Sequence, residues 1–322
     1  MQRRIVTFGL AASTLLGHSK AWSQTFPNKP IHIVVPYPPG GAPDALARMV
    51  ALQVANSIGQ QLVVENRPGA GGAIATEYVM RAPADGYTIL LADSSVYSIN
   101  PNLSTTIAYQ PLRDFASLTM AATSPLFLVA NNGLNVNSVK DLIAVAKAKP
   151  GLAYASSGNG TAHHLMMKWF KTMAGIDLTH VPYKGSTQTM PAVVAGDVAT
   201  AFGGSTTALP LAKAGKLKML AVATPKRSVF APDLPTVAEA GLPGFGIDIT
   251  LGFLLPVKTP RDIVTKLSTE FVKAIKTAGT QEKMMTAGLE PFGTSPEQFG
   301  EMIRNENILY ARLVKETGAK VD

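Results

Sequence analysis

The chain of 322 residues contains no cysteine, so it has neither a disulfide nor a lipid-modified cysteine anchor. The hydrophobic core alone must therefore stabilise the fold. Beyond the first residues, no apolar segment is long and charge-free enough to cross a bilayer, which takes roughly 20 residues. Lys and Arg are dispersed and form no aromatic-basic motif, which argues against a nucleic-acid partner. We expect a soluble protein that does not bind nucleic acid.

The sequence also lacks the short motifs of common cofactor and catalytic sites. It has no Gly-Lys-Ser/Thr and no Gly-x-Ser-x-Gly, and the dinucleotide fingerprint fails because His163 and Ile74 stand where the third glycine belongs. His163 and His164 are adjacent, so on a helix they diverge by about 100° and cannot share a metal ion. The carboxylates show no pairing that suggests acid-base catalysis. We expect no cofactor, no metal site and no catalytic residue.

The first residues have the pattern of a secretory signal peptide. Arg3 and Arg4 precede an apolar stretch over residues 5–16, and residues 21–23 form a small-x-small triplet suited to cleavage. We assign residues 1–24 to the signal, with twin-arginine export as an open alternative to ordinary secretion. The net charge is +8, and loss of Arg3, Arg4 and Lys20 leaves +5, a moderate excess that favours anionic solutes.

Short apolar strands alternate with helices along the rest of the chain. One series starts with strands at 31–35, 62–65 and 87–92, and a second starts at 126–130, where Ser138 is the expected N-cap of the next helix. The alternation predicts an α/β fold with two doubly wound domains, each a parallel sheet covered on both faces. The expected division is residues 25–123 plus 247–322 for one domain and 124–246 for the other. Two crossings between domains would make a hinge and a central cleft.

A proline- and glycine-rich turn joins the first strand to the first helix. Prolines 36, 38, 39 and 43 have no N–H, so the backbone donors in this turn are those of Tyr37, Gly40, Gly41, Ala42 and Asp44. Because the helix entrance carries the positive end of the macrodipole, a carboxylate or phosphate is favoured there. A rigid connection without a ligand remains an alternative. The Asp44 carboxylate would repel an anion unless it caps the helix start or meets a cation.

Other loops follow strands at the carboxyl edge, where open α/β sheets bind ligands. Residues 156–161 supply glycines, hydroxyls and N–H groups at a second helix entrance, which makes them the second candidate anion site. Two more loops hold Ser94 and the run from Gly203 to Ser205. The candidate ligand-binding residues are Tyr37, Pro39, Gly40, Gly41, Asp44, Ser94, Ser157, Gly158, Asn159, Gly160, Thr161, Gly203, Gly204 and Ser205.

Several sequence blocks resemble, in the same order, one protein family along nearly the whole mature chain. They cover residues 34–44, 63–72, 84–88, 154–161, 180–185 and 234–241. The chain resembles the tripartite tricarboxylate transporter substrate-binding receptors, also called Bug proteins. The resemblance implies a periplasmic Venus-flytrap receptor, without catalysis, that closes on a small organic acid and hands it to a membrane permease. It also implies that loops at 37–41 and 157–161 hold one carboxylate.

The sequence departs from the family pattern at two places. Pro38 and Pro39 stand where many members carry small residues, and Gly203 and Gly204 replace larger polar residues. The resemblance therefore leaves the usual polar contact in doubt, and the two glycines suggest room for a bulkier or aromatic acid.

Two other functions stay open from the residues alone. In the first, the chain is a receptor that presents its closed form to a sensor kinase instead of a permease. In the second, the chain is an exported hydrolase whose nucleophile is Ser94 or Ser157, with His163 as the base. We expect a monomer, and the identity of the carboxylate stays open.

Overall fold

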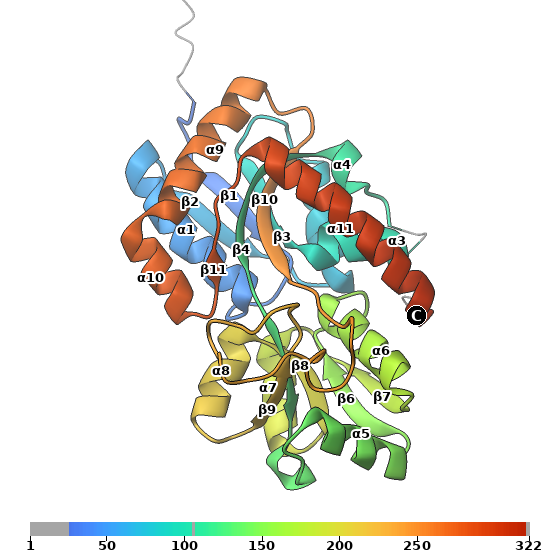
Figure 1. Cartoon of the computed structure of the whole chain (residues 1–322). Helices are drawn as coiled ribbons and strands as arrows, with labels where there is room; N and C mark the ends of the chain where they lie inside the picture. The colour runs from blue at the N-terminus through green and yellow to red at the C-terminus, as the bar shows by residue number, and fades with distance from the viewer. Residues whose placement is uncertain (1–25, 105–106, 320–322) are drawn as a thin grey trace, which may run out of the picture.

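The computed structural model describes residues 26–104 and 107–319; the signal peptide predicted at residues 1–24 lies outside them. The described chain forms two α/β domains, each built on one sheet, and Figure 1 shows one above the other. Within the described ranges, no helix has both the length and the apolar character of a membrane span.

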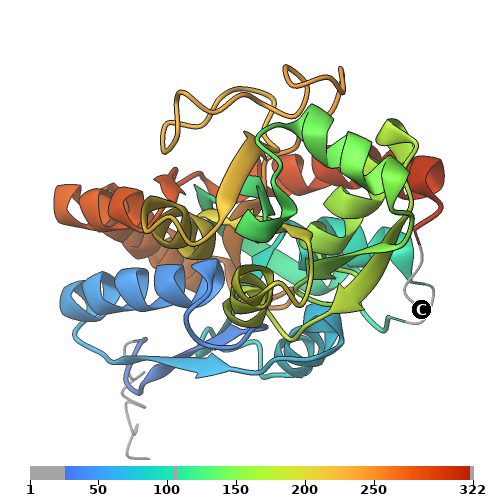
Figure 2. The same cartoon turned by 90° about the horizontal axis from the view of Figure 1, so that it is seen from below.

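The sheet of the first domain has six strands in the order β11-β4-β10-β3-β1-β2. Its first elements are β1 (Ile31–Val35), α1 (Ala42–Ile58), β2 (Leu62–Asn66), α2 (Ala73–Met80), β3 (Thr88–Asp93), α3 (Asn100–Leu103), α4 (Pro111–Asp114) and β4 (Phe115–Thr123). Its last elements are β10 (Thr250–Pro256), α9 (Arg261–Lys276), α10 (Ala278–Thr286), β11 (Glu290–Pro291) and α11 (Pro296–Thr317). Helices far apart in sequence share its core: Figure 2 shows α1 beside α9 and α10.

The sheet of the second domain has five strands in the order β7-β6-β8-β5-β9. Its elements are β5 (Leu126–Ala130), α5 (Val139–Ala148), β6 (Leu152–Ser156), α6 (Ala162–Ala174), β7 (Leu178–Pro182), α7 (Ser186–Ala195), β8 (Thr200–Gly204), α8 (Ser205–Lys213) and β9 (Lys218–Val222). The predicted N-cap of α5 is confirmed, since the Ser138 hydroxyl accepts a hydrogen bond from the Asp141 amide at 3.1 Å.

Both sheets are mixed, so the prediction of fully parallel sheets was wrong. β1, β2 and β3 are parallel to one another, as β6 is to β7 and β8, but β4 and β10 pair antiparallel in the first sheet and β5 is antiparallel to β8 and β9 in the second. The physical reason is the path between domains. Because the chain leaves the first domain through β4 and returns through β10, these two strands run in opposite directions.

The two crossings lie side by side. β4 continues through Ser124 and Pro125 into β5, and the return passes Ile249 into β10. The Ser124 amide donates to the Ile249 carbonyl at 2.8 Å, which joins the two crossings by a backbone hydrogen bond. The crossings thereby bring the turn after β1 and the helix entrances of the second domain toward one region.

Candidate functional site

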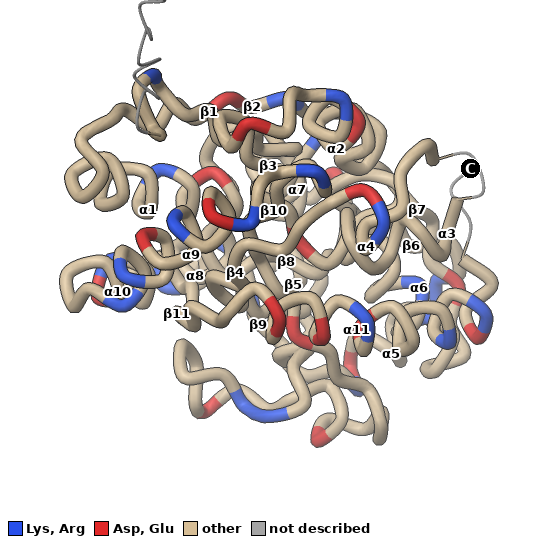
Figure 3. The backbone as a smooth tube through the Cα atoms, turned by 90° about the horizontal axis from the view of Figure 1, so that it is seen from above, with Lys and Arg blue, Asp and Glu red and all other residues tan. Residues whose placement is uncertain are grey.

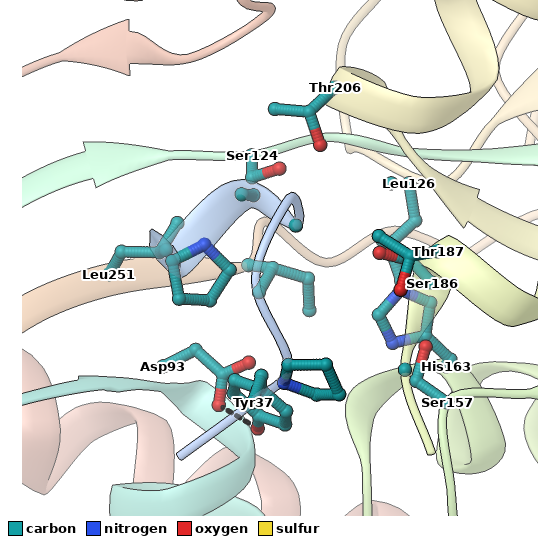
Figure 4. A pocket seen from close by; sticks show the side chains of 17 residues that line it. Tyr37, Asp93, Ser124, Leu126, Ser157, His163, Ser186, Thr187, Thr206 and Leu251 are labelled. Atoms are coloured by element: carbon teal, nitrogen blue, oxygen red, sulfur yellow. Dashed lines mark hydrogen bonds between the residues drawn. The ribbon is translucent and has the colours of Figure 1, made fainter. Parts of the chain in front are cut away.

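A pocket lies between the two domains next to these crossings. It encloses about 540 Å³, including the part that is open to solvent. Figure 4 shows Tyr37 and Asp93 on one side of it, and Ser157, His163 and Ser186 on the other. The lining residues are Tyr37, Pro38, Gly41, Ala42, Pro43, Asp93, Ser124, Leu126, Ser157, His163, Gly185, Ser186, Thr187, Gly204, Thr206, Ile249 and Leu251.

Two helix N-termini meet at this pocket without a side-chain cap. The N-cap residues are Gly41 for α1 and Gly185 for α7, and neither has a side chain that accepts from the first turn. First-turn amides have no carbonyl partner within their own helix. The two entrances are close: a Cβ atom on Gly40 would lie 3.2 Å from Thr187 Cγ2, and one on Gly41 would lie 3.3 Å from Ser186 Oγ. The positive ends of two macrodipoles therefore face one small volume.

Three buried side-chain atoms in the pocket wall have no hydrogen-bond partner among the described residues. They are Ser157 Oγ, His163 Nε2 and Thr206 Oγ1. Ser157 is 7% exposed, so its hydroxyl is withdrawn from bulk water. A buried polar group left unpaired costs about 1–3 kcal/mol, so a ligand that pairs with these atoms recovers that free energy. These atoms mark the pocket as a place for a polar ligand.

The entrance of α6, by contrast, is satisfied by the protein itself. Thr161 is its N-cap, and its hydroxyl accepts from the His164 amide at 3.4 Å. The Ala162 amide donates to Ser95 Oγ of the first domain at 2.9 Å. Fewer first-turn amides of α6 are therefore left for a ligand than the glycine-rich sequence suggests.

The Asp44 carboxylate, in the first turn of α1, bonds to the Gly40 amide just before the helix and to the Arg48 cation. It accepts from the Gly40 amide at 3.0 Å, from Arg48 Nε at 3.1 Å and from Asn66 Nδ2 at 3.0 Å. Burial opposes ionisation, but the hydrogen bonds from Arg48, Gly40 and Asn66 outweigh it and lower the pKa of Asp44. The negative charge is thus neutralised locally, and it occupies the Gly40 amide that was predicted to bind the anion.

The pocket wall carries little formal charge. Among the described residues that line it there is no Lys or Arg, and Asp93 is the one acidic residue. Burial lowers the pKa of His163 to about 4, so its imidazole is neutral near pH 7. Figure 3 shows Lys and Arg interspersed with Asp and Glu along the chain. Backbone amides and hydroxyls, rather than cationic side chains, are therefore the donors in this pocket.

The structure brings some of the predicted site residues to the pocket and places others away from it. Tyr37, Gly41, Ser157 and Gly204 line it. Gly158 and Asn159 line an adjoining groove that also reaches Tyr37 and Ser157. The remaining predicted residues lie outside its lining: Pro39, Gly40, Asp44, Ser94, Gly160, Thr161, Gly203 and Ser205.

Three of these residues have structural contacts instead. Ser94 Oγ accepts from the Thr250 amide at 3.0 Å, and Ser205 Oγ donates to the Gly288 carbonyl at 2.6 Å. A Cβ atom on Gly203 would lie 2.6 Å from the Met190 sulfur, so this glycine makes room for α7 rather than for a ligand.

Sequence reasoning did not single out Asp93, Ser186, Thr187 and Thr206 as site residues. A signal for two of them was present, because Gly185, Ser186 and Thr187 follow a strand and begin a helix, as the residues after β6 do. Asp93 and Thr206 are adjacent to the predicted Ser94 and Ser205, in segments predicted to be loops that follow strands, and this position was their local signal. Only the approach of the two domains shows that they share a pocket.

The geometry does not support a serine hydrolase at this pocket. Ser157 Oγ and His163 Nε2 each lack a hydrogen-bond partner, so they are not bonded to each other. Ser94 is 0% exposed and bonded to Thr250. Neither candidate nucleophile is hydrogen-bonded to the proposed base.

Comparison with known proteins places the chain in one family. Residues 46–319 match the model of the tripartite tricarboxylate transporter family receptor. Protein BugT of Bordetella pertussis is 34% identical over 100% of this chain and 99% of its own length. The structure of R. palustris Rpa4515 with adipate has a TM-score of 0.89 and 35% identity, covering 92% of this chain and 99% of that one. MatC from Rhodopseudomonas palustris with bound malate has a TM-score of 0.85 and 27% identity, covering 90% of this chain and 100% of that one.

These matches extend over both domains and are independent of the pocket geometry. The family consists of substrate-binding receptors rather than enzymes, which agrees with the unpaired Ser157 and His163. This chain belongs to the tripartite tricarboxylate transporter receptor family.

Proposed function

We propose that this chain is a periplasmic receptor that captures a small organic carboxylate between its two domains for uptake by a tripartite tricarboxylate-type transporter. The observation that carries the proposal is the meeting of the uncapped α1 and α7 N-termini at one pocket that also holds the unpartnered Ser157 hydroxyl. The relatives with bound adipate and malate support the same ligand class.

Ligand binding should favour the closed arrangement of the domains. The α1 amides belong to the first domain, and the α7 amides and the Ser157 hydroxyl belong to the second. An anion meets both sets of donors only when the domains are together, so its differential affinity shifts the population toward the closed form.

The remaining parts of the proposal concern export and partners. We assign residues 1–24 to a cleaved signal, residues 25–123 plus 247–322 to one domain and residues 124–246 to the other. The mature receptor would act as a monomer that delivers its ligand to membrane permease subunits. Co-purification of those subunits from membranes, with and without ligand, tests the partner and separates it from a sensor kinase.

The central experiment is isothermal titration of the protein lacking residues 1–24 with adipate, malate and their uncharged diamides. Because the pocket offers amide and hydroxyl donors, the acids should bind and the diamides, which match them in size, should not. The proposal fails if no carboxylate binds while a neutral sugar or a metal ion does.

A further inference from the structure

A buried carboxyl group lies in the wall of a pocket that otherwise offers donors. Asp93 ends β3, is 6% exposed and lines the pocket. Its Oδ1 accepts from the Tyr37 hydroxyl at 2.8 Å and from the Ser95 amide at 3.0 Å. Figure 4 shows the Asp93 carboxyl beside the Tyr37 ring, across the pocket from Ser157 and His163.

The hydrogen bond between Tyr37 and Asp93 fixes what this wall presents to a ligand. Tyr37 has one hydroxyl proton and donates it to Asp93, so toward the pocket its oxygen can only accept. The Asp93 carboxyl group is also an acceptor; burial raises its pKa, while its hydrogen bonds with Tyr37, Ser95 and Val96 favour the ionised form. With no Lys or Arg among the described lining residues, nothing in this wall compensates a second negative charge. A carboxylate placed here is repelled, whereas an ammonium or hydroxyl group finds partners.

The rest of the pocket has the opposite character. The α7 entrance supplies amides, and Ser157 and Thr206 supply unpartnered hydroxyls. Leu126, Ile249 and Leu251 add apolar surface. The pocket thus has a region of donors suited to a carboxylate, a region of acceptors at Tyr37 and Asp93, and apolar walls.

We propose that the pocket selects a carboxylic acid that carries a hydrogen-bond donor, an ammonium or a hydroxyl group, at its other end, and that Asp93 and Tyr37 recognise this donor. This inference rests on the proposed function, because the carboxylate region is the one proposed above. It narrows the ligand class from organic acids in general to amino or hydroxy acids.

The experiment compares acids of equal length that differ only at the far end. Titrations of the wild-type protein use 6-aminohexanoate, 6-hydroxyhexanoate, adipate and hexanoate, and the matching four-carbon set. For the length that binds, the amino or hydroxy acid should bind about tenfold more tightly than the diacid. Asp93→Asn should remove most of this preference, and Asp141→Asn, an exposed acidic residue on α5, should leave it unchanged.

A second variant covers the case in which Asp93→Asn does not fold. Tyr37→Phe keeps the carboxyl group but removes one of the two acceptors, so it should reduce the preference for the amino or hydroxy acid over the diacid without reversing it. The inference is overturned if diacids bind as tightly as amino and hydroxy acids, if Asp93→Asn folds and leaves the ratio of affinities unchanged, or if Tyr37→Phe leaves it unchanged. If no acid of either set binds and the diacids of other lengths also fail, the proposed function itself is wrong.

Discussion

The entrances of α1 and α6 follow similar glycine-rich turns, yet the structure uses them differently. At α1 the N-cap is Gly41, which has no side chain to accept from the first turn. At α6 the N-cap is Thr161, whose hydroxyl caps the helix, and the Ala162 amide is taken by Ser95. The glycine content of a turn therefore does not decide whether its amides are free for a ligand. The side chain at the N-cap position and the neighbouring domain decide it.

The entrance of α7 is the one that resembles α1. Both have a glycine N-cap without a side-chain hydrogen bond, and both line the pocket. We therefore propose a binding role for the entrances of α1 and α7 and a structural role for the entrance of α6. Substitutions at these three entrances can separate the two roles.

The largest effect is expected for Gly41→Pro. It removes the Gly41 amide and adds atoms where a Cβ would lie 3.3 Å from Ser186 Oγ. Loss of a hydrogen bond to a charged ligand together with this crowding should weaken carboxylate binding by about 3 kcal/mol, on the order of a hundredfold in Kd. Pro39→Ala, at an exposed position outside the pocket, is the control for titration calorimetry. Equal losses in the two variants would contradict a binding role for this turn.

The next effect concerns the pH dependence of stability through His163, near the start of α6. Burial lowers the pKa of His163 from 6.5 to about 4. As the pH falls, the His163 imidazole is therefore protonated in the unfolded chain before it is protonated in the folded protein. The stability that the neutral imidazole contributes is complete above pH 6.5 and is lost as the pH falls toward about 4. His163→Gln removes this loss. The free energy of unfolding of the variant, relative to that of wild type, should therefore be about 2 kcal/mol higher at pH 4.5 than at pH 7.5.

Urea unfolding of both proteins at the two pH values measures this change. Other groups titrate in the same range, but they are common to wild type and His163→Gln, so the difference between the two isolates His163. A constant difference across this range would show that the imidazole is not buried in the folded state.

A smaller effect is expected for Gly71→Ala, which tests contact between the domains. A Cβ atom on Gly71 would lie 2.7 Å from the Asn159 carbonyl oxygen of the second domain. The substitution should oppose closure and weaken ligand binding by about 1.4 kcal/mol, or roughly tenfold. Gly59→Ala is a matched control, because Gly59 has φ +68°, close to the +60° of Gly71, but no atom within 4 Å of the added Cβ.

Titration calorimetry and thermal unfolding of both glycine variants distinguish strain from closure. Both should lose similar stability, since an alanine in the left-handed region costs about 1–2 kcal/mol. Only Gly71→Ala should lose affinity. If Gly59→Ala loses as much, the effect comes from general destabilisation.

The smallest effect on binding is expected for Thr161→Ala. Loss of the N-cap should lower the free energy of unfolding by about 1 kcal/mol, as should Ser138→Ala at the N-cap of α5. Because the α6 amides serve the protein, the Kd should change no more in Thr161→Ala than in Ser138→Ala. A selective loss of affinity in Thr161→Ala would give α6 the binding role that the sequence predicted for it.

Local patterns accounted for much of the fold. In the sequence, Leu46, Val50 and Val54 recur at i, i+4 and i+8, the spacing of one helix face, and in α1 all three are 0% exposed. Ser138 predicted the start of α5 because capping is a contact over three residues. The predicted parallel strand directions were wrong for several strands, since the antiparallel pairing of β4 and β10 joins residues more than a hundred positions apart and no local pattern indicates it.

The candidate site, like the fold, was predicted only in part from the sequence. The sequence by itself determined that the turn after β1 leads into a helix and has few backbone donors, because its prolines and glycines lie within residues 36–43, and that Asp44 was placed to bond locally at this entrance. It also carried the blocks that resemble the receptor family. Only the tertiary structure decided that α7 faces α1 and that Asp93 lies in the pocket. The physical reason is that these contacts depend on how two domains, joined by two adjacent crossings, come together, and no local pattern encodes that approach.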